Sequence, residues 1–129
     1  MRTTRPKEIE GVLRLDGAAR FAHFMKRVAD EQLAWGLRAD GWALMVDDEG
    51  QSAFPIWPAR EYAALCAVDD WAGYHPTLIP VDELMSEWAS RLKGRAVRPA
   101  VFPTPTGKGV VVSVDEFCEA LRSELSQYE

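Results

Sequence analysis

The 129-residue sequence has few of the residues that usually mark a catalytic or metal site. It contains two cysteines and two histidines, and neither histidine has a histidine or cysteine at metal-ligand spacing. The motifs Gly-x-Ser-x-Gly, His-Glu-x-x-His and Cys-x-x-Cys do not occur in it. We therefore expect no catalytic residue, no metal site and no cofactor, and a hydrolytic enzyme ranks third among the functions considered.

The sequence also lacks long apolar runs and an excess of positive charge. Every apolar run is far shorter than the roughly 20 residues that a membrane-spanning helix needs. No hydrophobic segment follows residues 1–6, as it would in a signal peptide. The formal net charge is −5, which disfavours a nucleic-acid partner. We expect a cytoplasmic protein that binds neither membranes nor nucleic acids.

The two cysteines are separate in the sequence and fall within helical patterns. Cys66 and Cys118 are interpreted as buried or partly buried thiols, which suits a reducing compartment. A nucleophilic pair of Cys66 and His75 is arithmetically possible. However, Cys66 lies late in its predicted helix, where the helix dipole opposes a thiolate. We therefore expect neither cysteine to be catalytic.

The bulk composition predicts one domain over residues 1–129. A single core is the usual outcome near this length. Apolar residues make up 47% of the chain and charged residues 27%, as in ordinary globular proteins. Five Trp, five Phe and three Tyr supply the bulky surface that a sizeable core requires.

Apolar spacing alternates between helical and strand periods along the chain. Capping residues predict helices that begin near Thr4, Asp16 and Ser113, and Gly36 can end the second of them. Two further helices are predicted over residues 58–69 and 81–93. Short strands are predicted at residues 35–37, 42–46, 53–57, 77–79, 97–102 and 109–112. The order predicts an α+β domain with a mixed or mostly antiparallel sheet of about five to six short strands and four to five helices packed on it.

Residues 41–62 are expected to hold much of the core. Trp42, Leu44 and Val46 alternate as one buried face of a strand would. The acidic residues 47–49 are consecutive, unlike calcium-loop ligands, so they are interpreted as a solvated hairpin turn. Pro55 lacks a backbone donor, which favours an edge position or a bulge in the next strand.

Basic residues gather toward the C-terminal third of the chain. Arg91, Lys93, Arg95 and Arg98 are typical of a basic last helical turn followed by a solvated loop. Thr106-Gly107-Lys108-Gly109 resembles a phosphate loop, but it lacks the Ser or Thr after Lys and opens a strand, so a hairpin loop is favoured. If an anion binds, the expected site is Arg95, Arg98 and Lys108.

Several aromatic residues lie at strand ends or in loops bracketed by prolines. Trp57, Trp71 and Tyr74 are either satellite core or anchors of a protein interface. Arg60 and His75 lie beside them in the sequence. These five residues, Trp57, Arg60, Trp71, Tyr74 and His75, form the predicted partner-binding set.

Short segments along nearly the whole chain resemble, in order, the bacterial family catalogued as domain of unknown function 2750. The segments that carry the likeness are Trp35-Gly36-Leu37, Asp40-Gly41-Trp42-Ala43-Leu44, Phe54-Pro55-Ile56-Trp57-Pro58, Glu61-Tyr62-Ala63, Trp71-Ala72-Gly73-Tyr74, Asp82-Glu83-Leu84, Phe102-Pro103 and Gly107-Lys108-Gly109-Val110. The resemblance implies a small, bacterial, single-domain, cytoplasmic protein and brings no catalytic residues. The pattern of strand, acidic turn, Phe-Pro and helix is also similar, by analogy, to small bacterial immunity and secretion-enhancer proteins.

Two functions follow as hypotheses from these observations. The first is a non-catalytic protein-interaction module, similar to immunity proteins, that binds a protein partner of unknown identity through its loop aromatics. The alternative is a small-molecule or nucleotide-binding regulatory domain, with a pocket that contains Lys108, Arg95 and His75. The absence of a nucleophile, metal motif or cofactor motif favours both over an enzyme.

Overall fold

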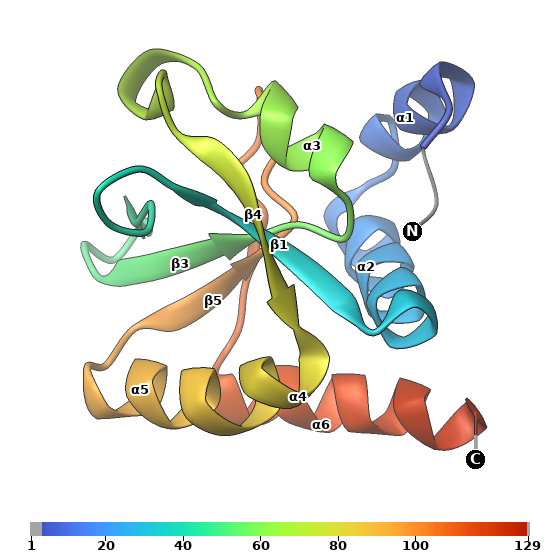
Figure 1. Ribbon diagram of the computed structural model, residues 1–129, viewed down its shortest axis with the longest axis vertical. Coiled ribbons are helices and arrows are strands. Elements are labelled where there is room, and N and C mark those ends of the chain that lie inside the picture. Colours follow the sequence, from blue (N-terminus) through green and yellow to red (C-terminus); the bar gives the residue numbers. More distant parts are fainter. Residues whose placement is uncertain (1–3, 129) are drawn as a thin grey trace.

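Six strands in two sheets lie at the centre of the computed structural model, which describes residues 4–128 (Figure 1). One sheet pairs β1 (Leu33–Arg38) with β4 (His75–Pro80) in antiparallel register. The other has the order β2-β3-β5-β6, with β2 Met45–Val46, β3 Ser52–Ile56, β5 Arg98–Val101 and β6 Val110–Val111. β3 and β5 are parallel, and the remaining pairs are antiparallel. The predicted α+β class is confirmed.

Trp35 and Trp57 join the two sheets through their backbones. The N–H of Trp35 donates to the carbonyl of Trp57 at 2.9 Å, and the reverse bond is 2.8 Å long. This isolated bridge is the place where β1 meets the end of β3. The predicted single sheet is therefore divided in two, linked at one point.

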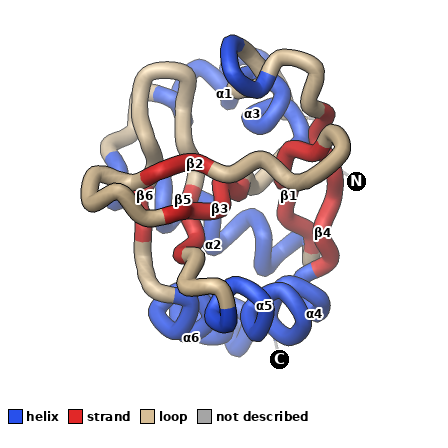
Figure 2. Tube along the Cα trace, turned by 90° about the vertical axis from the view of Figure 1, so that its left-hand side faces the viewer, coloured by secondary structure: helices blue, strands red, loops and turns tan. Residues whose placement is uncertain are grey.

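The helices surround the sheets on several sides (Figures 1 and 2). Their bounds are α1 Pro6–Leu13, α2 Gly17–Glu31, α3 Arg60–Leu65, α4 Val81–Glu83, α5 Ala89–Gly94 and α6 Val114–Leu125, with 3-10 turns η1 Asp69–Trp71 and η3 Ser126–Tyr128. In both views α4, α5 and α6 lie at the lower end, and α1 and α3 lie at the upper end. None of the helices within residues 4–128 combines the length and apolarity needed to cross a membrane.

A π-helical turn, η2 (Leu84–Trp88), connects α4 to α5 without a break. The backbone N–H of Ala89 reaches the carbonyl of Leu84, five residues earlier. The sequence predicts a regular α-helix here, because the spacing of apolar residues does not reveal a single π turn within a helix. π turns are rare and often occur at functional sites, and this one ends at Trp88.

Two of the predicted helix caps are confirmed, whereas the third predicted cap and one predicted helix end are wrong. The Asp16 carboxylate accepts from the Ala19 N–H at 2.8 Å, and Ser113 forms a capping box with Glu116. Thr4 is not a cap: α1 starts after Arg5, and buried Thr4 instead donates its backbone N–H to Glu61 at 3.4 Å. The second helix ends at Glu31 rather than near Gly36, because Gln32 takes a left-handed φ of 62°.

Gly36 lies in the middle of β1, underneath an indole ring. A Cβ at this position would lie 2.9 Å from Cζ3 of Trp42. The glycine is therefore explained by close approach of a side chain rather than by the end of a helix.

The buried face predicted for residues 42–46 is wrong. Ala43 is 2% exposed, whereas Leu44 and Val46 are 51% and 61% exposed. Regular pairing in this segment is limited to Met45 and Val46, opposite Ala53 and Ser52. Burial still alternates along this segment, but Ala43 and half-buried Met45 are the less exposed residues, because a period of two does not say which of the two faces is buried.

Pro55 lies in β3, a strand with neighbours on both sides, yet it costs no ladder hydrogen bond. β2 pairs with β3 only as far as Ala53, and β1 meets the chain again at Trp57. On this side of β3, Pro55 lies between the end of β2 and the start of the contact with β1, so no strand is paired with it there. On the other side of β3, Pro55 is paired with Ala100 of β5. The edge position predicted for Pro55 therefore holds for this residue alone, because β3 as a whole lies between β2 and β5.

The core lies between the sheets and the helices. Its largest fully buried side chains include Trp57, Tyr62, Phe24, Phe54 and Phe102. They come from α2, β3 and the residue after it, α3 and the segment after β5, so the predicted sizeable core joins distant parts of the chain.

β4 is the outer strand of the two-stranded sheet. It places Pro76, Leu78 and Pro80 opposite Leu37, Trp35 and Leu33. Trp35 directs its N–H and carbonyl toward Trp57, so Trp35 and Leu78 form a non-hydrogen-bonded pair. The backbone of Leu78, and of the prolines two residues away on each side, therefore faces outward.

Candidate functional site

A groove of about 350 Å³ lies between the β1–β2 connection, β3 and α5. In Figure 1, α5 lies below β3 and β5, and the β1–β2 connection curves beside them. The residues that line the groove are Gly41, Trp42, Leu44, Phe54, Trp88, Arg91, Leu92, Arg95 and Val97. Most of these side chains are apolar or aromatic, which is typical of ligand pockets.

Three aromatic rings form one wall of the groove. Trp88 stacks on Phe54 with a centroid separation of 4.9 Å and an interplanar angle of 27°. Trp42 meets Trp88 edge-on at 4.9 Å and Phe54 at 6.0 Å. Phe54 is buried, whereas Trp42 and Trp88 are half-buried. The indole rings are therefore held in place from behind and still reach the surface.

Two arginines add positive charge to this apolar surface. Arg91 and Arg95 both line the groove and are exposed. The Arg91 guanidinium lies 5.6 Å from the centroid of the Trp88 ring, in cation–π range. No acidic side chain within residues 4–128 lines the groove, so its charged groups are all cationic.

The four basic residues noted at positions 91–98 have different environments. Lys93 pairs with Asp115 at 2.8 Å, and Arg98 pairs with Asp47 at 2.5 Å. In the part of the chain that the structure describes, neither Arg91 nor Arg95 makes an ion pair. The two guanidinium groups at the groove are thus the ones left without a carboxylate.

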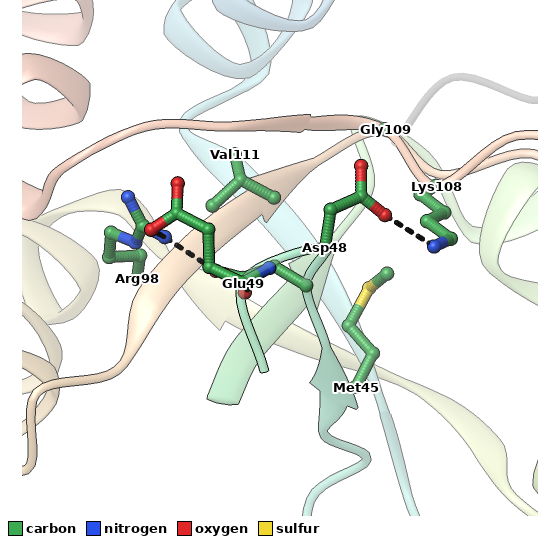
Figure 3. A pocket seen from close by; sticks show the side chains of 8 residues that line it. Met45, Asp48, Glu49, Arg98, Lys108, Gly109 and Val111 are labelled. Atoms are coloured by element: carbon green, nitrogen blue, oxygen red, sulfur yellow. Dashed lines mark hydrogen bonds and ion pairs between the residues drawn. The ribbon is translucent and has the colours of Figure 1, made fainter. Parts of the chain in front are cut away.

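A second, smaller pocket of about 210 Å³ surrounds the acidic turn (Figure 3). Figure 3 shows Lys108 directed at Asp48, to which it bonds at 2.6 Å, and Arg98 beside Glu49, at 3.9 Å. The segments that meet here are 51 and 60 residues apart in sequence. The acidic turn therefore meets the basic side chains across the pocket.

Hydrogen bonds perturb the charged groups of this second pocket. The pKa of Asp47 is lowered, chiefly because the Gln51 backbone N–H donates to its carboxylate and also because Arg98 does. The pKa of Lys108 is raised by its hydrogen bond to Asp48. Both shifts favour the charged forms, and the ion pairs Arg98–Asp47 and Lys108–Asp48 place a carboxylate beside each cation.

The structure divides the residues predicted to bind an anion. Arg98 and Lys108 line the acidic pocket, where an incoming anion would meet the carboxylates of Asp48 and Glu49. Arg95 lines the apolar groove instead. The three cations therefore do not share one pocket, and Arg95 belongs with Arg91.

The predicted partner-binding residues lie at several depths. Trp57 is fully buried, and its Nε1 donates to the Pro103 carbonyl at 2.8 Å. Trp71 is half-buried and meets the Trp57 ring edge-on at 6.1 Å. Tyr74 is half-buried, and Arg60 and His75 are exposed. Of the two interpretations left open for Trp57, its burial supports core.

Cys66 has the environment of a structural thiol. Its sulfur lies 3.5 Å from the Pro103 carbonyl, and burial raises its pKa to about 11. Burial also raises the pKa of Cys118. Since the thiolate is the nucleophilic form, neither side chain is activated for attack near neutral pH.

Of the residues that line the groove, only Arg95 belongs to a binding site predicted from the sequence. Trp88 lies within the helix predicted over residues 81–93, and Arg91 is predicted to lie in a basic last helical turn. A usable signal was present, because Trp88, Arg91 and Arg95 follow one another at helical spacing. What the sequence could not show is that Trp42 and Phe54 meet this face from two other segments.

The chain was compared with protein families, curated proteins and solved structures. A family model described as "Protein of unknown function (DUF2750)" matches residues 21–121. No curated protein and no solved structure matches the chain. The matched range contains every residue that lines the groove.

Proposed function

The chain belongs to the DUF2750 family of proteins of unknown function, and from its groove we propose that it binds a small apolar molecule without transforming it. The observation that supports this most is the wall formed by Trp42, Phe54 and Trp88 around an open volume of about 350 Å³. Ligand pockets typically measure about 300–1,000 Å³ and have such a lining. The site thus fits a molecule of one or two rings.

The side chains of residues 4–128 that line the groove can bind a ligand, but they include no good nucleophile or general base. Its lining combines aromatic and aliphatic side chains with two guanidinium groups, which remain protonated in proteins. Such groups can orient a ligand but do not readily accept a proton from it. These properties favour a binding or regulatory domain over an enzyme.

The first test measures a neutral fluorescent probe, N-phenyl-1-naphthylamine, by titration into the protein. We expect saturable binding at one site per chain and a loss of affinity of about tenfold in Trp88→Ala, because part of the aromatic wall of the groove is removed. A second variant, Leu44→Asp, should weaken binding by a similar factor. Leu44 is 51% exposed, so its replacement spares the core.

The matched control for this test is Leu65→Asp. Leu65 is 40% exposed and does not line the groove, so probe affinity should remain within about twofold of the original chain. Thermal unfolding of each variant is monitored by circular dichroism, and a cooperative transition establishes that the variant is folded. Probe affinity that is unchanged in both Trp88→Ala and Leu44→Asp would contradict a ligand in the groove.

A protein partner is the second candidate, at a different surface. Residues 60–75 present exposed Leu65 and Val68, 40% and 50% accessible, in the same segment as half-buried Trp71. Exposed apolar side chains beside an anchored aromatic ring are typical of interfaces. Arg60, Tyr74 and His75 would contribute polar contacts there, as an immunity-like binder requires.

This second proposal is tested by affinity capture from the native host. We expect one protein to co-purify in a fixed ratio with the original chain and with Leu44→Asp. Capture should fall at least about fivefold with Trp71→Ala or Leu65→Asp, because interface energy concentrates on a few anchors. If the original chain and the three variants capture the same proteins in equal amounts, this surface is excluded as the binding site.

A further inference from the structure

We propose that the ligand of the groove is an organic acid with an apolar body, such as an aromatic carboxylate. This inference rests on the proposed function and names its ligand class. The apolar body would lie against the rings of Trp42 and Trp88, and the carboxylate would lie between the guanidinium groups of Arg91 and Arg95.

The charges of the groove support this class. Arg91 and Arg95 line it, and no carboxylate of the described residues opposes them there. Their neighbours in the chain behave differently, since Lys93 pairs with Asp115 and Arg98 pairs with Asp47. A guanidinium group presents paired donors that match the two oxygens of a carboxylate. The groove therefore has unused donors of the geometry that an organic acid requires.

Arg91 and Arg95 are also placed to act together. They are four residues apart along α5 and its C-terminal end, so their side chains emerge from the same face of the helix. Arg91 lies 5.6 Å from the centroid of the Trp88 ring, which fixes one guanidinium beside the aromatic wall. A ligand seated on that wall would thus have its acid group within reach of a positioned cation.

The helix end opposes an anion only weakly. A helix C-terminus carries a partial charge of about −0.5, and α5 ends at Gly94, next to Arg95. The two guanidinium groups contribute two full positive charges at the same place. The balance favours a monoanion, whereas the apolar lining offers no further cations for a polyphosphate.

The experiment compares two ligands of nearly identical shape, 2-naphthoate and 2-naphthamide, as competitors of N-phenyl-1-naphthylamine. We expect naphthoate to displace the probe at about tenfold lower concentration than naphthamide, since charge-assisted hydrogen bonds are stronger than neutral ones. In Arg91→Gln/Arg95→Gln the two competitors should become equal within about twofold. Both arginines are exposed, so the double variant is expected to fold.

The matched control removes two positive charges elsewhere. Lys93→Gln/Arg122→Gln changes exposed residues that do not line the groove, and it should keep the preference for naphthoate. Equal displacement by both competitors in the original chain would overturn the acid proposal while leaving an apolar ligand in place. A preference that persists in Arg91→Gln/Arg95→Gln would also overturn it. Failure of the neutral probe to bind would instead remove the proposed function itself.

Discussion

Trp57→Ala is expected to lower the free energy of unfolding by about 3–5 kcal/mol, the range for large-to-small changes in a core. Trp57 has no solvent exposure, and its indole N–H donates to the Pro103 carbonyl at 2.8 Å. Its backbone also joins the two sheets through Trp35. The substitution leaves a cavity and removes the strongest donor to a buried carbonyl.

Two further variants separate the contribution of the hydrogen bond from that of the packed ring. The free energy of unfolding of each variant is measured by urea denaturation, monitored by circular dichroism. Trp57→Phe keeps part of the ring and loses the hydrogen bond, so a loss of about 1–3 kcal/mol is expected. Trp71→Ala removes the half-buried ring that meets Trp57 edge-on and should cost less than Trp57→Ala. A loss below about 1.5 kcal/mol for Trp57→Ala would show that this side chain does not support the core as described.

Gly109→Ala is expected to cost about 2–4 kcal/mol, from a left-handed backbone and from steric overlap. Gly109 has a φ of +81°, and a Cβ would lie 2.7 Å from the Val101 carbonyl oxygen and 2.9 Å from the Pro103 nitrogen. Both contacts are with backbone, which cannot move aside as a side chain can. The connection from β5 to β6 therefore requires glycine here.

Gly50→Ala provides the control, since it reproduces the backbone angle without the overlap. Gly50 has a φ of +80°, and no heavy atom lies within 4 Å of the position that a Cβ would take. Its replacement should cost about 1 kcal/mol. Urea unfolding of both variants separates the two contributions, and equal losses would contradict the steric explanation.

The sequence predicted two helix starts from signals that lie within the helices' own first turns. Asp16 and Ser113 cap helices because each side chain bonds the backbone three residues later. The α+β class followed from the order of such elements. Gly36 was misassigned because its reason is the ring of Trp42, and glycine at a helix end looks the same in sequence as glycine under an indole.

The candidate site could be predicted only in part, because its residues meet through tertiary contacts. Trp42, Phe54 and Trp88 come from three separate segments, and Trp88 is the last residue of a π turn that periodicity does not predict. The pairing of the basic residues also depends on tertiary contacts. Arg98 and Lys108 were reasonable anion ligands by sequence, but the acidic turn that neutralises them lies 51 and 60 residues away.

The outer strand β4 limits the ways in which this chain can associate. Three of its residues direct their backbones outward, and two of these, Pro76 and Pro80, have no N–H to donate. A foreign strand that docked alongside would find a single amide, that of Leu78, where a regular edge offers three. Extension of the sheet into a neighbouring molecule is therefore blocked at this edge, so a partner that approaches here has to recognise side chains rather than add a strand.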